Sequence, residues 1–152
     1  MRRDGPIVAS ELKDRIQADV NAARKERDKA RVLVLSTLLS EIKNKEIDGG
    51  TPLDDDAVIQ VVSKAIKQRN DAATQMRDGG RNELAEVEEA QAEILQAYLP
   101  EALSEDEVRA MVRAAIASGA DQMGPLMGKI MPQIRGRFDG QEANRIVREE
   151  LV

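Results

Sequence analysis

The chain contains only two aromatic residues, Tyr98 and Phe138, among 152. Apolar residues make up 41% of the sequence, so its core must be built from Leu, Ile, Val, Ala and Met. Sheets favour aromatic and β-branched side chains, whereas packed helices accept this aliphatic set. A chain of this length can bury a core without disulfides, and it contains no cysteine. The sequence therefore predicts an all-α globular protein.

Apolar residues recur every three or four positions in seven segments, the spacing of one helix face. Turn signals separate the segments, among them residues 48–52 and Gly79-Gly80. Short connections between the first four segments predict antiparallel neighbours. We place a domain boundary at Tyr98-Leu99-Pro100. The prediction is an N-terminal antiparallel four-helix body over residues 1–98 and a three-helix C-terminal lobe over residues 99–152.

Polar residues just before the apolar segments predict where the helices begin. The expected caps are Ser10, Asp28, Asp54, Asn82, Ser104, Asp121 and Asp139. Ser104 and Glu107 have the spacing of a capping box. In the fourth helix the spacing predicts that Leu84, Val87, Ile94 and Leu95 face inward. These features set the expected helix positions.

The tail of the chain combines glycine, proline and methionine with basic charge. From residue 123 to residue 152 there are five basic and four acidic residues, against 18 and 24 in the remainder. The basic residues are Lys129, Arg135, Arg137, Arg145 and Arg148. Arginine pairs well with phosphate, and helix starts attract anions. The tail is therefore either a phosphate-binding surface or, as the residue types alone favour, an apolar core stripe with the arginines on an ordinary solvated face.

The expected tail helix also carries small and flexible residues. Gly124 and Gly128 leave a flank where another backbone or a ligand can approach closely. Met127 and Met131 belong to an apolar stripe that either fills the core or docks on a partner. Both interpretations stay open at the level of sequence.

Residue types argue against catalysis. Without His or Cys the chain has no imidazole base, no thiol nucleophile and no zinc site of the usual kind. No phosphate-binding glycine motif occurs, and the neighbours Ser63 and Lys64 lie mid-helix, where their side chains diverge. Residues 54–56 suit a helix start better than a metal. We expect no catalytic residue, no metal and no cofactor.

The tail contains Met-Gly-Lys-Ile-Met-Pro at 127–132 and Gly-Arg-Phe-Asp-Gly at 136–140. Two further motifs precede it in the chain, Lys67-Gln68-Arg69 and Tyr98-Leu99-Pro100-Glu101. This pattern resembles the GatB/YqeY family over nearly the whole chain, in the order and length of its small stand-alone YqeY-like members. In the larger GatB subunit of tRNA-dependent amidotransferases, a similar tail helps to hold the tRNA body. Phe138 stands where the family usually has a small residue.

The resemblance implies a module that binds tRNA, or is associated with tRNA amidotransferase, through its basic C-terminal lobe, and the residue types above indicate that this module is non-catalytic. Arg24, Lys25, Arg27, Lys29 and Arg31 could join this surface. The family also implies a carbon–nitrogen ligase with glutamine as amido-N-donor, but the GatB catalytic region has no counterpart here. With a net charge of −5 and few aromatics, recognition must use shape and backbone phosphates.

The alternative function is a protein-interaction adaptor. In this interpretation the Met- and Gly-rich tail helix docks on an aminoacyl-tRNA synthetase or an amidotransferase subunit, partners that the resemblance implies. Neither DNA nor a membrane is an expected partner. Residues 1–6 contain two arginines but no long apolar run behind them, so we expect no signal peptide. The uncharged stretch 32–40 is too short to span a bilayer, and the expected address is the cytoplasm.

Overall fold

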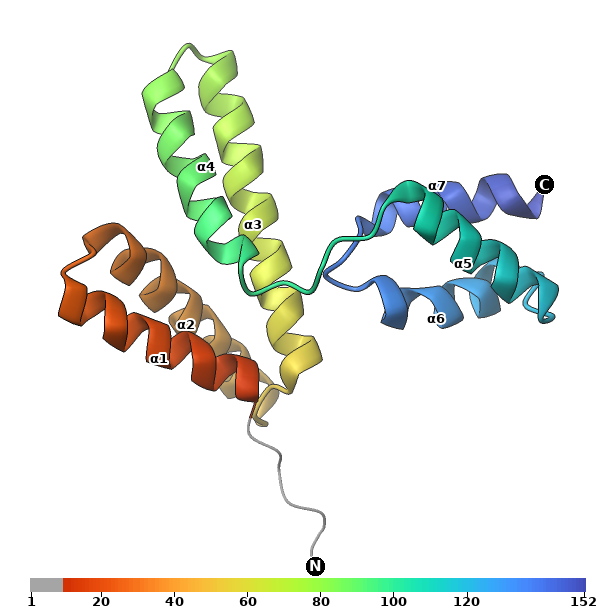
Figure 1. Ribbon diagram of the computed structural model, residues 1–152, viewed down its shortest axis with the longest axis horizontal. Coiled ribbons are helices and arrows are strands. Elements are labelled where there is room, and N and C mark those ends of the chain that lie inside the picture. Colours follow the sequence, from red (N-terminus) through yellow and green to blue (C-terminus); the bar gives the residue numbers. More distant parts are fainter. Residues whose placement is uncertain (1–9) are drawn as a thin grey trace, which may run out of the picture. The chain divides into compact units, whose positions relative to one another are not determined.

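The structure is a computed structural model that describes residues 10–152, which form seven α-helices and no strand (Figure 1). The helices are α1 (Glu11–Glu26), α2 (Lys29–Gly49), α3 (Asp55–Asp78), α4 (Asn82–Gln96), α5 (Glu105–Ala117), α6 (Met123–Ile134) and α7 (Gly140–Leu151). The prediction of an all-α protein is confirmed. Residues 1–6, for which no signal peptide was expected, lie outside the described residues.

The chain divides into two compact units between Leu99 and Pro100. The first unit contains α1 to α4 and the second contains α5 to α7, and each has a hydrophobic core of its own. This division is compatible with the predicted four-helix body and three-helix lobe. That each unit is a domain able to fold alone stays a prediction.

The core of the first unit gathers aliphatic side chains from α1, α2, the first half of α3 and the end of α4. Its members are Ile16, Val20, Val34, Leu35, Leu38, Ile42, Val58, Val61, Val62, Ala65, Ile66, Ala92, Leu95 and Tyr98. Helices α1 and α2 form one hairpin, and α3 and α4 form another (Figure 1). Helix α2 also contacts α3 and α4, so it joins the two hairpins.

The core reaches only the C-terminal end of α4. Nearer the α3–α4 turn, the buried residues are the alanines Ala73 and Ala85. The prediction that Leu84 and Val87 face inward is wrong, because their exposed fractions are 50% and 53%. Two helices that pack against each other through alanines bury only a narrow stripe, and the bulky neighbours of that stripe remain in water.

Helix starts follow most of the expected caps. Side-chain oxygens of Ser10, Asp28, Asp54, Ser104 and Asp139 each accept a backbone hydrogen bond, and the Ser104–Glu107 capping box is present.

The expected caps Asn82 and Asp121 are wrong. Asn82 is already the first residue of α4, since the Arg81 N–H closes the preceding turn on the Met76 carbonyl at 2.7 Å. Helix α6 begins after Gln122, which makes no side-chain cap.

Polar side chains hold the N-terminal and central parts of α1 to the rest of the first unit. Lys13 Nζ lies 2.7 Å from Glu46 Oε1, and this contact holds the pKa of Glu46 below its usual value. The Tyr98 hydroxyl donates to Asp19, and the Arg15 guanidinium lies 4.9 Å from the centre of the Tyr98 ring. Burial, together with this hydrogen bond, raises the pKa of Tyr98. Tyr98 is therefore a structural side chain that fastens the end of α4 to α1.

The second unit packs three helices around one core, with each helix in contact with the other two. The buried members are Val108, Val112, Ala120, Leu126, Ile130, Ile134, Ala143, Ile146 and Val147. Phe138 packs against this core, so its ring fills space inside the unit. Helix α6 continues past Pro132 to Ile134.

The first unit offers a matched test of its core. Leu38 is 1% exposed and Leu33, on the same helix, is 60% exposed. We predict that Leu38→Ala lowers the free energy of unfolding by about 2–5 kcal/mol, because it leaves a cavity. Leu33→Ala should change it by less than about 0.5 kcal/mol. Urea unfolding measures both, and equal losses would contradict this assignment of the core.

Candidate functional site

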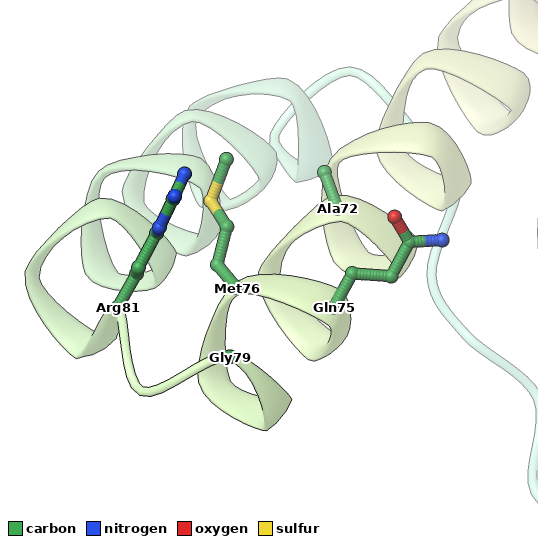
Figure 2. A pocket seen from close by; sticks show the side chains of 5 residues that line it. All are labelled: Ala72, Gln75, Met76, Gly79 and Arg81. Atoms are coloured by element: carbon green, nitrogen blue, oxygen red, sulfur yellow. The ribbon is translucent and has the colours of Figure 1, made fainter.

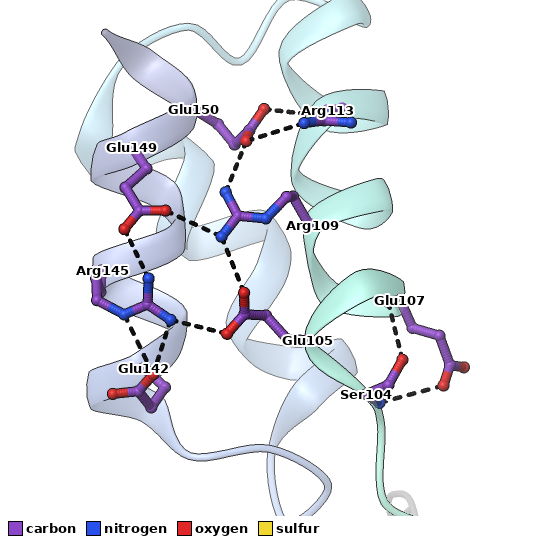
Figure 3. A network of polar contacts seen from close by, with 9 residues as sticks. All are labelled: Ser104, Glu105, Glu107, Arg109, Arg113, Glu142, Arg145, Glu149 and Glu150. Carbon is purple, nitrogen blue, oxygen red and sulfur yellow. Dashed lines mark hydrogen bonds and ion pairs between the residues drawn. The ribbon is translucent and has the colours of Figure 1, made fainter.

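Some basic side chains of the second unit form ion pairs with glutamates, and others have no ion-pair partner among residues 10–152. The first group consists of Arg109 and Arg113 on α5 and Arg145 on α7, which bond to glutamates of the same two helices (Figure 3). We call this set the ion-pair network; its members are Glu105, Arg109, Arg113, Glu142, Arg145, Glu149 and Glu150. It joins α5 to α7 along one side of the unit.

Arg109 lies at the centre of the network. Its Nη1 is 2.8 Å from Glu150 Oε2, and its Nη2 is 2.9 Å from Glu149 Oε1. Hydrogen bonds from Arg109 and Arg145 hold the pKa values of Glu105 and Glu149 below their ordinary range. Arg113 and Arg109 do the same for Glu150. These glutamates are charged at neutral pH, and they neutralise the arginines that they contact.

Arg145, a predicted phosphate ligand, is a member of this network. Its guanidinium contacts Glu105 at 2.8 Å, Glu142 at 2.9 Å and Glu149 at 2.6 Å. Its contact with a phosphate stays a prediction, and such a contact must compete with three carboxylates.

Arg137 braces the segment between α6 and α7. Its Nε donates to the Glu101 carbonyl at 2.9 Å, and its own carbonyl accepts from the Leu103 N–H at 2.8 Å. Gly136, with φ of +75°, supplies the left-handed turn just before it. Arg137 thus fixes the elbow, residues 135–139, against the segment that precedes α5. The sequence carries no signal for this role, since the bonded residues lie 36 positions apart.

The remaining predicted ligands are Lys129, Arg135 and Arg148, and none has an ion-pair partner among residues 10–152. Lys129 Nζ lies 3.4 Å from Ser118 Oγ, at the end of α5, whereas Arg145 contacts Glu105 at its beginning. Helix α5 has 13 residues and is therefore about 20 Å long. The predicted basic residues are distributed along the unit and do not meet at one point.

The small and the sulfur-containing residues of α6 face different ways. Gly124 and Gly128 are exposed, and no atom lies within 4 Å of the position that a Cβ would take at either residue. Met127 and Met131 are half-buried and pack against the core. The Met131 methyl lies 3.7 Å from the Cβ position of Gly140. The glycines offer an open flank, and close approach of a partner there stays a prediction.

A shallow pocket at the α3–α4 turn was not found by sequence reasoning (Figure 2). It has a volume of about 350 Å³ and is lined by Ala72, Gln75, Met76, Gly79 and Arg81. Arg81 is the single titratable residue of this lining, so the pocket offers no acid–base pair for general acid–base chemistry. The glycine pair followed by arginine was the only sequence signal at this place.

Within residues 10–152, no three carboxylates gather in an arrangement that could hold a metal ion. Over the same range, every helix is either too short or too polar to cross a bilayer.

The sequence pattern of the family described as "Yqey-like protein" matches residues 13–151. The chain belongs to the YqeY family. Curated relatives of this YqeY-family chain bear the name "Altered inheritance of mitochondria protein 41, mitochondrial". Identity is 28% to the protein of Pyrenophora tritici-repentis, over 89% of this chain and 78% of the relative. It is 38% to that of Lachancea thermotolerans, over 64% and 54%. It is 30% to that of Clavispora lusitaniae, over 78% and 71%.

This comparison corrects the expected address. The cytoplasmic expectation is contradicted, because the curated relatives are named as mitochondrial proteins. The expectation relied on the lack of a long apolar segment. The length of apolar segments indicates whether a helix can span a bilayer, but it does not indicate the compartment in which a protein resides.

The ion-pair network predicts acid sensitivity. Because the pKa values of Glu105, Glu149 and Glu150 are lowered from 4.5, the contribution of the network to stability is complete above about pH 4.5 and is lost as the pH falls through their lowered values. Arg109→Ala should lower the melting temperature at neutral pH and lower it progressively less as the pH falls. Arg148→Ala is the control, with the same charge change and no such partner. Equal shifts for the two variants in a circular-dichroism melt would contradict the assignment.

Proposed function

We propose that this YqeY-family chain is a non-catalytic accessory module that binds tRNA through the basic residues of its second unit. The observation that supports this most directly is the uneven pairing of charge. Four glutamates neutralise Arg109, Arg113 and Arg145, while Lys129, Arg135 and Arg148 have no carboxylate partner within residues 10–152. The resemblance of the tail to that of the tRNA-holding GatB subunit gives the class of ligand.

The pairing also suggests which side chains contact phosphate. Lys129, Arg135 and Arg148 can bind an anion without first giving up an ion pair, whereas Arg145 must break contacts with three carboxylates. Arg137 acts as a positioning residue, because its guanidinium and carbonyl hold the elbow that carries Arg135. The proposed ligands are thus Lys129, Arg135 and Arg148.

The proposed recognition is of backbone and shape. Base stacking requires exposed aromatic rings, but Tyr98 is 3% exposed and Phe138 packs against the core. Phosphate contacts from lysine and arginine carry no base preference and release counterions. The binding therefore depends steeply on salt and favours a folded RNA surface.

The chemistry associated with the bound tRNA belongs, in this proposal, to a partner enzyme. The chain has no His and no Cys for acid–base or nucleophilic work, and the resemblance to GatB covers the helical part without its catalytic region. A tRNA-dependent amidotransferase subunit or an aminoacyl-tRNA synthetase would be such a partner. We therefore propose no carbon–nitrogen ligase activity for this chain by itself.

Charge removal tests the proposal. We predict that replacing Lys129, Arg135 and Arg148 together by alanine weakens binding to total tRNA at least tenfold at about 0.1 M salt. The slope of log affinity against log salt should fall by about 0.7–0.9 for each phosphate that the protein no longer neutralises. Arg113→Ala is the control, because it removes the same type of charge from a side chain that Glu150 already neutralises.

Filter binding or fluorescence anisotropy over a series of salt concentrations measures both quantities. A circular-dichroism melt of each variant separates loss of binding from loss of folding. The proposal is wrong if the triple variant binds as tightly as the parent protein. It is also wrong if Arg113→Ala has as large an effect per residue as the triple variant.

The second candidate function is the protein-interaction adaptor, favoured by the open space above Gly124 and Gly128. Gly128→Leu should leave the fold intact, because nothing lies within 4 Å of its Cβ position, but should block a partner that packs against the glycine flank. Gly49→Leu, at an equally open helical position of the first unit, is the matched control. Co-purification with an amidotransferase or synthetase subunit at low salt measures the difference. Unchanged co-purification of Gly128→Leu would exclude docking at this flank.

A further inference from the structure

The turn between α1 and α2 is the most basic stretch of the first unit. We call residues 24–31 the basic turn; it holds five basic residues, Arg24, Lys25, Arg27, Lys29 and Arg31, and two acidic ones, Glu26 and Asp28. The rest of residues 10–99 holds nine basic and 16 acidic residues. A local positive charge thus stands out from an acidic unit.

Charges of the basic turn have few partners within the described part of the chain. The ion pair found there joins Arg31 Nε to Asp28 Oδ2 at 3.8 Å, and Asp28 also caps α2 by accepting from the Arg31 N–H. Lys25, Arg27 and Lys29 are exposed and have no ion-pair partner among residues 10–152. Their charge is available to a ligand from solution.

The basic turn contains a left-handed backbone conformation that is unfavourable for the residue that adopts it, Arg27. Arg27 ends α1 in the left-handed conformation, with φ of 60° and ψ of 32°, and is the only non-glycine residue with positive φ among residues 10–152. Glycine is the usual residue here because a Cβ crowds the adjacent carbonyl. Gly50 occupies the same position after α2. Local stability alone would favour glycine at position 27.

The charge at the start of α2 is also unfavourable. Lys29 is the first residue of α2 and Arg31 is the third, and the first turn contains no acidic residue. The N-terminal end of a helix carries partial positive charge and favours carboxylates. Helices α1, α3 and α5 follow that preference, with two or three acidic residues in the first turn of each. The basic turn therefore departs from the helix-end preferences that α1, α3 and α5 follow at their starts and that Gly50 follows after α2.

We propose that the basic turn is a separate phosphate-contact site that binds the backbone of a structured RNA. Local costs of this kind mark places where residues serve a ligand and not the fold. The cations of the turn, more numerous than its two carboxylates, give a positive potential that suits phosphate, although Asp28 already caps the start of α2. Exposed aromatic rings are missing from the turn, so it contacts the backbone and not the bases. One exposed apolar residue nearby, Leu33, is too little for membrane insertion.

The choice of RNA as the polyanion rests on the proposed function, but the site itself belongs to the first unit and is independent of the tail. The proposed site at the basic turn and the proposed site in the tail can therefore be disproved independently. Loss of binding in the tail variants alone would overturn the basic turn, and loss in the turn variants alone would overturn the tail.

The left-handed conformation of Arg27 and the basic charge of Lys29 at the start of α2 allow the proposal to be tested. Arg27→Gly should raise the melting temperature by about 4–8 °C, and Lys29→Glu should also raise it, because both variants relieve a local cost. Each should nevertheless weaken binding of the full chain to total tRNA about 3- to 10-fold at about 0.1 M salt. A residue with a purely structural role cannot give greater stability and weaker binding together.

Two controls separate the effects of the backbone conformation and of the overall charge change. Arg27→Lys retains the charge and the left-handed conformation, so it should change neither the melting temperature nor the affinity appreciably. Lys64→Glu makes the same charge change as Lys29→Glu at an exposed site on α3 and should weaken binding much less. Equal effects of Lys64→Glu and Lys29→Glu, or unchanged binding of Arg27→Gly, would overturn the proposal.

The lack of cysteine allows the contact to be located directly. An iron–EDTA reagent on Ala30→Cys, at an exposed position inside the turn, should cleave bound tRNA at discrete backbone positions. The same reagent on Ala90→Cys, at an exposed position of α4, is the control. Cleavage from neither site, or equally from both, would overturn the proposal. So would turn variants that lose binding to phosphatidylglycerol vesicles while their tRNA binding is unchanged.

Discussion

Burial of aliphatic side chains, almost without aromatic rings, is the constraint on which both units depend. The largest fully buried side chains are isoleucines and leucines such as Ile16, Leu38 and Ile146. None of them fills as much volume as a tryptophan, so the helices must approach closely, and buried alanines at 73, 85 and 143 permit this. Each helix then buries a narrow stripe, and most of its circumference remains polar and available for charge.

The distribution of charge follows from that geometry. Where two helices lie side by side, their facing charges pair: Arg109 with Glu150 between α5 and α7, and Arg77 with Glu89 between α3 and α4. Basic residues at helix ends and turns, such as Arg27 and Arg135, have no facing helix to supply a carboxylate. Cations without an ion-pair partner among residues 10–152 also lie within helices, as Lys43 and Lys129 do. Both proposed phosphate contacts are built mainly from such unpaired cations.

The sequence predicted the features that depend on local chemistry. Caps such as Ser104 and Asp139 could be recognised because a short polar side chain serves its own helix. Leu84 and Val87 were misplaced because the spacing of apolar residues does not show that a neighbouring helix packs on alanines. The role of Arg137 could not be read from the sequence, since its partner Glu101 lies 36 positions away. For Arg145 the sequence places Glu142 and Glu149 at helical spacing, but the third partner, Glu105, lies 40 positions away. A pattern of basic residues identifies candidates, but only the fold separates neutralised cations from available ones.

An acidic protein that binds a polyanion must do so by orientation. With a net charge of −5, the protein as a whole repels phosphate, and cations that lack carboxylate partners attract it locally. In the proposed function, repulsion elsewhere would exclude wrong poses and give specificity for the shape of an RNA without any contact to its bases. In a uniformly basic protein of the same fold, an arginine in the left-handed conformation at position 27 would add little. In this one, under the proposed contact, it would supply a cation without a carboxylate partner, and that use would account for a local cost in stability.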